Sequence, residues 1–510
     1  MDGGFDYLIV GGGSAGCIVA RVLAERGFRI GIVEPVPANT PRRLPADYPR
    51  SFGSQEDWGW SSTPQEKLAN RRLRQPRGRG PGGSTRINAM IWNPPNQADL
   101  SMLHRHGGTL WATERFKQSL ERVTAWVRPT RPAWVSEVTT RFLNIGAAGV
   151  DPPHAYLRMA DRCGRRTAAD VLREQPGPDH DRVRWIDGQA ERILFENSSA
   201  GDDHPTATAV AVRVAASHSA EPLFAARGII LCAGAFGSPD LLFRSGVGPA
   251  ADLEACRVPH VIVNEAVGRN LTDHLVMPIV FQISPKDRFP HRLSVRDLAR
   301  WQVSGMGPAS SNLAEAGGIF TLPGRSESDE GSDGLNDLYQ VHVTPTHYLL
   351  HPSDSAPAAM SIGVNVCRPD SRGRITFRRD GDEIIPLIDP GYLSAENDIA
   401  RTALAVQGGR ALASSSPLKS VLGQELVPGP KRQSAESVYQ SIRRYSQSLY
   451  HPVGTCRMSS YGDGVVDQGC HVHGTRQLYV IDASILPEIP LINPNATVMA
   501  VALHAAQLID

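Results

Sequence analysis

Lysine is scarce in this 510-residue sequence, with five lysines against 48 arginines. Neither sign of charge is in excess, because 53 basic residues face 52 acidic ones and leave a formal net charge of +1. A balanced charge points to neither a nucleic acid nor a membrane surface as partner. No run of 18 apolar residues is present, so the sequence predicts no transmembrane helix. The first residues lead directly into a strand pattern, and we expect no secretory leader.

Cysteine is sparse and irregularly placed. The cysteines are odd in number, scattered and never spaced as C-x-x-C, which argues against a disulfide framework and a zinc site. The pairs His104/His106 and His471/His473 lack the carboxylates or cysteines that would complete a metal site. We therefore predict no bound metal and a reducing, cytoplasmic location. The seven cysteines are Cys17, Cys163, Cys232, Cys256, Cys367, Cys456 and Cys470.

The remaining composition is that of a large globular protein. Hydrophobic residues make up 41 % of the chain and charged residues 21 %, which is ordinary for a soluble fold. A chain of this length buries a large core without disulfide or metal staples, and it predicts two or three domains.

A nucleotide-binding pattern opens the chain. Residues 6–10 form a short apolar run, 17–26 have helical periodicity, and 28–33 form a second apolar run. Between the first two lies Gly-Gly-Gly-Ser-Ala-Gly, in which Gly11, Gly13 and Gly16 match G-x-G-x-x-G and enclose Ser14 and Ala15. Such a loop brings a pyrophosphate to a helix N-terminus. The spacing therefore predicts dinucleotide binding.

Glu34 ends the second apolar run, 18 residues after Gly16. A carboxylate there is expected to accept the ribose hydroxyls, and it would repel the 2′-phosphate of NADP. A glycine-rich turn without a ligand would leave this acid unexplained. The motif alone does not choose between NAD and FAD, although its place at the start of a long chain favours FAD.

Further elements follow from periodicity and turn residues. We expect strands at 205–216 and 228–233, a turn or loop at 197–204, and a mobile, acidic, serine-rich loop at 324–334. An amphipathic helix is expected at 113–126 and an apolar closing helix at 496–509. Asn493 or Asn495 is the expected cap of that last helix.

Several longer motifs carry a family resemblance. They begin with Asp-Trp-Gly-Trp at 57–60 and Gly-Gly-Ser-Thr-Arg-Ile-Asn-Ala-Met at 82–90, and continue with Cys-Ala-Gly-Ala-Phe-Gly-Ser-Pro at 232–239 and Val-Gly-Arg-Asn-Leu-Thr-Asp-His at 267–274. Near the end come Tyr-His-Pro-Val-Gly-Thr-Cys-Arg-Met at 450–458, Val-Ile-Asp-Ala-Ser at 480–484 and Asn-Pro-Asn at 493–495. In this order they closely resemble the glucose–methanol–choline (GMC) family of FAD oxidoreductases.

The resemblance implies an α/β, Rossmann-like FAD-binding domain of the GMC type and an α+β substrate domain with an antiparallel sheet. FAD-binding segments are expected at 1–100, 180–275 and 445–510, the last with the catalytic residues. The substrate domain is expected at 276–444, with 101–179 a mixed connection that also contributes to it. Family members use FAD to oxidise an alcohol to a carbonyl, and the partners implied are a small-molecule alcohol and oxygen or another electron acceptor.

His451 and Asn493 are the catalytic candidates that the resemblance implies. Hydride loss from an alcohol carbon requires a base for the hydroxyl proton, and an imidazole titrates near working pH. His451 matches the family's catalytic histidine, and a buried histidine before Pro452 is the alternative. Asn493 matches the second member of the family's pair, with a helix-capping role as its alternative and Asn495 as the competing position.

The resemblance also implies a set of cofactor contacts. Ile87 stands where some members carry a histidine bonded to the flavin, so we predict non-covalent FAD. Asp482 has a strand-end turn as its alternative role, and the first turn of the closing helix is expected to stabilise negative charge on the flavin. The contact candidates are Gly11, Gly13, Ser14, Ala15, Gly16, Glu34, Trp58, Arg77, Gly82, Gly83, Asn88, Ala89, Met90, Ala190, Ala233, Gly234, Tyr450, Asp482, Ala483 and Pro494.

Some features depart from the family pattern. Pro35 and Val36 replace the usual small residues after the acid, Gln468 replaces a proline, and Trp-Asn-Pro-Pro at 92–95 stands near the expected active-site entrance. Trp92, His347 and Tyr348 are candidate pocket residues, with core packing as the alternative. A hydroxynitrile-type lyase, a photodecarboxylase and a non-enzymatic flavoprotein are the competing functions, and retention of both His451 and Asn493 favours alcohol oxidation.

Overall fold

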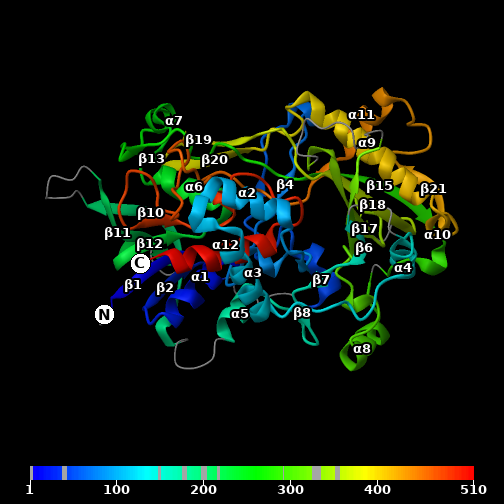
Figure 1. Ribbon diagram of the computed structural model, residues 1–510, viewed down its shortest axis with the longest axis horizontal. Coiled ribbons are helices and arrows are strands. Elements are labelled where there is room, and N and C mark those ends of the chain that lie inside the picture. The colour runs from blue at the N-terminus through cyan, green and yellow to red at the C-terminus, as the bar shows by residue number, and fades with distance from the viewer. Residues whose placement is uncertain are drawn as a thin grey trace.

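Two β-sheets organise the fold, one in each half of an elongated molecule (Figure 1). The structure is a computed structural model, and it describes residues 4–36, 43–146, 151–174, 181–196, 204–214, 219–290, 292–323, 335–350 and 356–509. The expected loop at 324–334 and most of the loop at 197–204 lie outside the described residues, as do residues 215–216 of an expected strand.

The first sheet joins a parallel layer to an antiparallel meander. The parallel layer has the order β10–β2–β1–β12–β23, and β10, β11 and β12 continue as antiparallel neighbours. The strands expected at 6–10 and 28–33 are β1 and β2, and those at 205–216 and 228–233 overlap β11 and β12. The strands are β1 (Phe5–Val10), β2 (Ile30–Glu34), β10 (Val183–Glu196), β11 (Thr206–Val214), β12 (Ala220–Leu231) and β23 (Leu478–Val480).

Helices cover this sheet and share its apolar core. In α1 (Ser14–Glu25) ten consecutive residues from Ala15 to Ala24 are buried, and the helix ends before Gly27, whose φ of 93° suits the left-handed position after a helix. The helix expected at 113–126 is α3 (Thr113–Val127), and the closing helix is α12 (Asn495–Leu508). The other helices of this half are α2 (Gln97–Gly107), α5 (Ala168–Arg173), α6 (Gly234–Arg244) and α7 (Ala250–Ala255).

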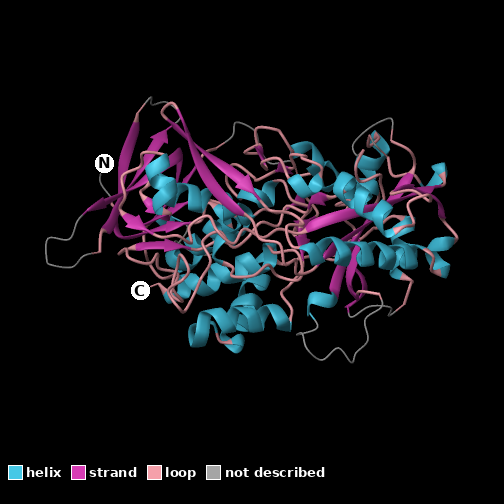
Figure 2. Ribbon diagram, turned by 90° about the horizontal axis from the view of Figure 1, so that it is seen from above, coloured by secondary structure: helices cyan, strands magenta, loops and turns pink. Residues whose placement is uncertain are grey.

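The second sheet is antiparallel, with the order β21–β15–β18–β17–β16–β6 and β22 beside β15. Helices line one side of it (Figure 2). Its strands are β6 (Asp151–Ala155), β15 (Leu275–Ile283), β16 (Ala316–Thr321), β17 (Leu338–Thr344), β18 (Ala359–Val366), β21 (Leu422–Val427) and β22 (Gln447–Ser448). The helices of this half are α4 (Glu137–Leu143), α8 (Val295–Ser304), α9 (Glu396–Ala413), α10 (Ser416–Lys419) and α11 (Ala435–Tyr445).

The two faces of the second sheet differ in chemistry, because alternate residues of a strand point to opposite sides. Tyr339, Val341 and Val343 of β17 belong to an apolar cluster with residues of α9 and α11. Gln340 and His342 lie between them and face the other way, although all these residues are buried. A buried polar face of this kind is directed at the first half of the molecule, as the contact of Gln340 with Asn493 shows.

The chain crosses between the halves several times. Residues 101–179 contribute to both halves, because α3 and α5 pack on the first sheet whereas β6 joins the second. The hairpin of β19 (Arg374–Asp380) and β20 (Glu383–Asp389) lies within 276–444, yet it packs against α6 and α7. Smaller pairs are β3 (Trp60–Ser61) with β4 (Arg74–Gln75), β5 (Ile91–Trp92) with β7 (Leu157–Arg158), β8 (Ala160–Asp161) with β9 (Gly164–Arg165), and β13 (Val247–Gly248) with β14 (Ile262–Val263).

One local expectation is wrong. Neither Asn493 nor Asn495 caps α12: the N-cap is Pro494, which lacks a side-chain donor or acceptor, and Asn495 is already the first helical residue. The Asn493 amide is engaged elsewhere, with His451 and Gln340. All seven cysteines are free thiols. Among the described residues, no helix is both long and apolar enough to cross a membrane.

Candidate active site and dinucleotide cradle

The backbone of His451 is held by a buried carboxylate. Asp273 precedes β15 and accepts the His451 amide N–H at 2.7 Å with Oδ1. Its Oδ2 accepts the hydroxyls of Ser448, at 2.5 Å, and Tyr392. Tyr450 has a left-handed backbone, with φ of 66°, and so turns the chain sharply just before the histidine. Asp273 thus connects both Ser448 and His451, on either side of the turn, to Tyr392.

A second imidazole sets the tautomer of His451. His274 Nε2 lies 2.8 Å from the carbonyl oxygen of Cys367, which can only accept, so His274 carries its proton at Nε2. Its Nδ1 is then an acceptor, and it lies 3.0 Å from Nδ1 of His451. The His451 proton therefore resides at Nδ1 and the lone pair at Nε2. A neutral imidazole with a lone pair at one defined atom is what a general base requires.

Asn493 faces that lone pair. Its Nδ2 lies 3.2 Å from His451 Nε2, and its Oδ1 accepts a hydrogen bond from Gln340 Nε2 at 3.3 Å. Gln340 therefore holds the amide with its NH₂ group toward the imidazole. Asn493 is 8 % exposed, whereas the His451 side chain remains partly accessible.

The surroundings keep His451 neutral. Burial, followed by the neighbouring His274, His342 and Arg77, holds its pKa well below the ordinary value of 6.5. Burial also lowers the pKa of His274, and it lowers that of His342 to about 3. Arg77 donates to the carbonyl oxygen of Tyr450 at 2.6 Å, which places a positive charge beside the imidazole.

The glycine motif forms a close crossing of backbones at the carboxyl end of β1. A Cβ atom on Gly11 would lie 2.5 Å from the carbonyl oxygen of Cys232, and one on Gly16 would lie 1.9 Å from that of Gly11. Gly13 is the N-cap of α1 and lacks a side chain, so the N–H groups of Ser14 and Ala15 begin the helix without a side-chain cap. Such an N-terminus suits an anionic pyrophosphate.

Glu34 lies beside this loop, where its Oε2 accepts from Gly12 N–H at 2.8 Å and its Oε1 from Gly80 N–H at 2.7 Å. Burial raises the pKa of Glu34 to about 7, although these backbone donors oppose that shift. Each oxygen keeps one further lone pair, so the carboxylate can still accept a ribose hydroxyl.

A second glycine segment crosses the first. Gly82 N–H donates to Gly12 O at 2.7 Å, and a Cβ on Gly83 would lie 2.6 Å from Gly13 Cα. Downstream, Arg165 donates to both the side-chain and the main-chain oxygens of Asn88, at 2.9 and 2.6 Å. The segment that the resemblance assigns to the flavin is therefore fixed against the nucleotide loop.

The same segment continues through Ala89, whose carbonyl oxygen accepts a 2.8 Å bond from Asn312, to the buried Met90 with φ of 60°. Ile87 precedes it and is buried, with no nucleophilic atom.

Two helix N-termini converge at this crossing. Ser14 Oγ lies 3.0 Å from Asn495 Oδ1, so the start of α1 touches the start of α12, and Figure 1 shows the two helices side by side. Pro494 supplies no side-chain cap. The positive ends of two helix dipoles are thus available to one anionic ligand.

The remaining cofactor candidates line adjacent segments. Asp482 uses its oxygens within the protein: Oδ2 accepts from Gly234 N–H and Ser238 Oγ, and Oδ1 from the backbone N–H and Oγ of Ser484. This geometry favours the strand-end turn for its side chain. Ala483 begins the next turn, and Ala233 is the N-cap of α6.

Two cofactor candidates remain, Trp58 and Ala190. The Trp58 ring is tilted at 43° to that of Trp60, and the Arg79 guanidinium lies over it. Ala190 lies on β10, opposite Val212 of β11.

Sequence reasoning missed the supporting residues. Asp273 and His274 are the last two residues of the motif at 267–274, which served only to establish the resemblance. An acid next to a histidine was the signal that could have identified them. No sequence signal identified Gln340 and His342, because alternating polar residues in a strand usually indicate an exposed face. Trp92 is fully buried in the core of the first half, as in the core-packing alternative.

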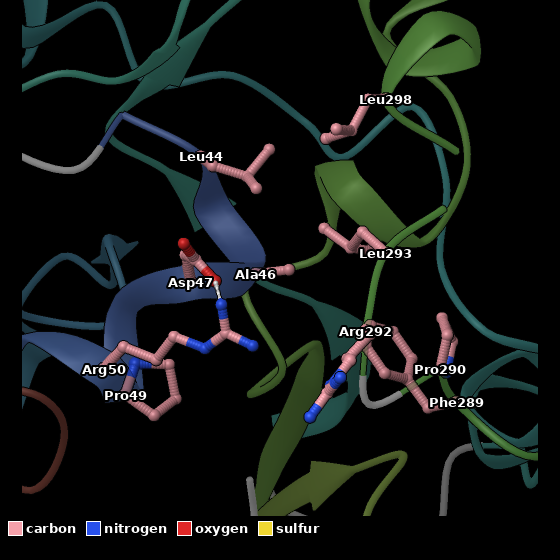
Figure 3. Close-up of a pocket in the computed structure, with 10 residues that line it drawn as sticks. All are labelled: Leu44, Ala46, Asp47, Pro49, Arg50, Phe289, Pro290, Arg292, Leu293 and Leu298. Carbon is pink, nitrogen blue, oxygen red and sulfur yellow. Dashed lines mark ion pairs between the residues drawn. The ribbon is translucent and has the colours of Figure 1, made fainter. Parts of the chain in front are cut away.

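The surface has a cavity of about 570 Å³ (Figure 3). The 3₁₀ helix η1 (Pro45–Ser51) forms one wall, and the other is formed by Phe289, Pro290, Arg292, Leu293 and Leu298. In η1, Asp47 pairs with Arg50 at 3.2 Å. Phe52, at the end of η1, packs edge-on against Tyr450, with 5.3 Å between ring centroids, so this wall contacts the neighbour of His451. Among the described residues, no group of three His, Cys, Asp or Glu side chains is arranged to hold a metal.

Known proteins match nearly the whole chain. Two family models described as GMC oxidoreductase match residues 5–175 with 179–276, and residues 369–502. An alcohol dehydrogenase [acceptor] of Pseudomonas putida is 29 % identical, over 99 % of this chain and 95 % of its own. An oxygen-dependent choline dehydrogenase of Cronobacter sakazakii is 28 % identical, over 98 % and 93 %.

Solved structures resemble the whole chain. Pyridoxine 4-oxidase from Mesorbium loti has a TM-score of 0.83 at 25 % identity, over 99 % of this chain and 98 % of its own. A formate oxidase has a TM-score of 0.87 at 22 % identity, over 100 % and 98 %, and this likeness concerns the fold.

Proposed function

The chain belongs to the GMC oxidoreductase family of FAD-dependent oxidoreductases, and from that premise we propose that it oxidises an alcohol to a carbonyl compound with His451 as the base. One observation carries the proposal. The hydrogen-bond chain from Cys367 through His274 fixes the His451 proton at Nδ1 and leaves the Nε2 lone pair facing Asn493.

The residues present fit FAD. The two crossed glycine segments leave backbone without side chains where a dinucleotide approaches, and the N-termini of α1 and α12 meet there. Glu34 keeps free lone pairs for a ribose. When bound, FAD supplies the hydride acceptor of the reaction. We propose that it binds without a covalent bond, because Ile87 offers no atom for one.

The chain's own residues account for proton transfer. His451 Nε2 takes the hydroxyl proton as the alcohol carbon loses its hydride, and His274 stabilises the ring by accepting from Nδ1. The Asn493 NH₂ donates to the substrate oxygen and orients it. Gln340 keeps that NH₂ in place. Arg77 lies near enough to His451 to depress its pKa, so its positive charge also favours an alkoxide-like oxygen.

The direct test is anaerobic photometry of the purified protein. Addition of an alcohol in the dark is expected to bleach the flavin band at ~450 nm, because hydride transfer reduces the cofactor. Readmitted oxygen then separates an oxidase, which recovers its colour at once, from a dehydrogenase that needs another acceptor. A flavin that no alcohol bleaches would contradict the proposal and favour a lyase or photodecarboxylase. A cytoplasmic location remains a prediction of the sequence.

A further inference from the structure

Three buried polar atoms beside the catalytic pair have no hydrogen-bond partner among the described residues. They are Gln340 Oε1, Asn365 Oδ1 and His342 Nε2. Gln340 is 1 % exposed, Asn365 is 0 % and His342 is 6 %. Folded proteins pair nearly all of their buried polar atoms, so three unpaired atoms close together point to a ligand that pairs with them.

The strand register places these three side chains on one face. Gln340 of β17 lies directly opposite Asn365 of β18, and opposite residues of an antiparallel pair point to the same side. His342 follows Gln340 by two residues and therefore shares that side. The contact of Gln340 with Asn493 identifies this side as the one that faces the catalytic pair. His342 also lies close enough to His451 to affect its pKa.

The hydrogen bonds already made define what the unpaired atoms need. The NH₂ of Gln340 is used by Asn493, and that of Asn365 by the carbonyl oxygen of Val366 at 3.3 Å. Both amides therefore present a carbonyl oxygen, which accepts and cannot donate. His342 Nδ1 pairs with the Tyr156 hydroxyl at 2.9 Å, which leaves Nε2 for a further partner. Gly317 makes this pair possible, because a Cβ there would lie 1.8 Å from that hydroxyl.

Charge on this face is low. The polar side chains that share it on β17 and β18 are those of Gln340, His342, Thr344, Asn365 and Ser361, and none of them is acidic or basic apart from the imidazole. Burial keeps that imidazole neutral, since the pKa of His342 is lowered to about 3. A cationic or anionic substituent would find no counter-charge on these two strands, whereas a hydroxyl or N–H group would find acceptors.

We infer that Gln340, Asn365 and His342 form a polar subsite that selects alcohols carrying a second, uncharged hydrogen-bond donor, such as another hydroxyl group. This inference rests on the proposed alcohol oxidation and adds the substrate class. Thr346 and His347, further along the same segment, line a small cavity that shares Phe289 with the surface cavity of Figure 3.

Matched alcohols test the inference, because a methyl ether removes the donor and keeps the oxygen. The probes are 1,3-propanediol against 3-methoxy-1-propanol, 3-hydroxybenzyl alcohol against 3-methoxybenzyl alcohol, and choline as a cationic alcohol. The readout is kcat/KM for anaerobic flavin reduction by the holoenzyme. We expect the donor-bearing member of at least one pair to exceed its ether, and choline, by at least about tenfold, since a site built to bond a hydroxyl rejects analogues without one.

Two variants separate this subsite from general damage. Asn365→Leu removes an acceptor without touching Asn493, and it is expected to reduce the preference for the donor at least fivefold. Gln282→Leu is the matched control, because it makes the same kind of change at an exposed position of the same sheet, and its preference should equal that of the wild type. If Asn365→Leu does not fold, the inference is tested by the donor preference of Gln340→Met, compared with that of the wild type.

Each outcome is decisive. Alcohols oxidised with no preference for the donor, or with choline preferred, would overturn the inference and leave the proposed oxidation standing. A wild-type preference that survives both Asn365→Leu and Gln340→Met would also overturn it. A yellow protein that none of the five probes reduces would overturn the subsite, because two of the probes carry the second hydroxyl, whereas the proposed oxidation falls only if no alcohol bleaches the flavin.

Discussion

His274 and His451 face each other through their Nδ1 atoms, 3.0 Å apart, with their ring planes at 81°. One proton lies between them, and the Cys367 carbonyl at the far side of His274 decides on which ring it resides. Through His274, the Cys367 carbonyl oxygen therefore determines that His451 carries its lone pair at Nε2. That lone pair faces Asn493.

Replacement of His274 is therefore expected to slow flavin reduction without loss of the cofactor. In His274→Phe the Nδ1–H of His451 loses its acceptor, and a hydrogen bond worth about 1.5 kcal/mol corresponds to about tenfold in rate. Stopped-flow measurement of the limiting reduction rate checks this. An unchanged rate in a variant with full flavin content would show that His274 does not position the base.

The pH profile should show an acid limb well below pH 6.5. The base works when unprotonated, and burial, followed by the neighbouring His274, His342 and Arg77, lowers the pKa of His451, so the neutral ring persists as the pH falls through 6.5. The measurement is kcat/KM against pH, which reports the free enzyme. Flavin content must be followed at each pH, because the pKa of Glu34 is raised to about 7. A half-maximal rate at pH 6.5 or above would contradict the account.

The crossing of the glycine segments should be intolerant of a methyl group. In Gly83→Ala the new Cβ lies 2.6 Å from Gly13 Cα, at a backbone φ of 50°. We expect at least a tenfold loss of FAD affinity, measured as flavin absorbance per protein after gel filtration. Gly4→Ala is the control, since a Cβ there meets nothing within 4 Å. Equal flavin content in both variants would place the cofactor elsewhere.

Denaturation should release the flavin. Because Ile87 offers no nucleophilic atom at the position where some family members bond the cofactor, acid precipitation is expected to leave a colourless pellet and a yellow supernatant. Absorbance of the two fractions is the measurement. Colour retained in the pellet would indicate a covalent bond to another residue.

The sequence predicted the elements that local chemistry dictates. The strand, glycine loop, helix and acid of residues 5–34 were readable because each has its own periodicity or turn residue, and β1, α1 and β2 confirm them. The closing helix was readable from its apolar residues, and it begins at Asn495, within one residue of the expected start, but the expected cap is wrong. Asn493 looked like a cap, yet its amide is recruited by His451 and Gln340, which are distant in sequence.

The supporting half of the site lay beyond sequence reasoning because it depends on long-range pairing. His274 and His451 are separated by 177 residues and meet only when β15 pairs with β22. Gln340 shows the same limit, since nothing in β17 reveals that its polar side faces another half of the molecule. Polar and apolar residues alternate in β17 as they do in a strand with one solvent-exposed face. Its polar face is buried only because the other half of the molecule packs against it.

The central claim is that His451 is the base, and its most direct test is anaerobic stopped-flow reduction of His451→Ala by an alcohol that reduces the wild type. We expect reduction to slow by about 10²- to 10⁴-fold, the usual contribution of a general base, with unchanged flavin content. His104→Ala, at an exposed histidine of α2, is the control and should match the wild type. A His451→Ala protein that retains its flavin and is reduced within threefold of the wild-type rate would contradict the account.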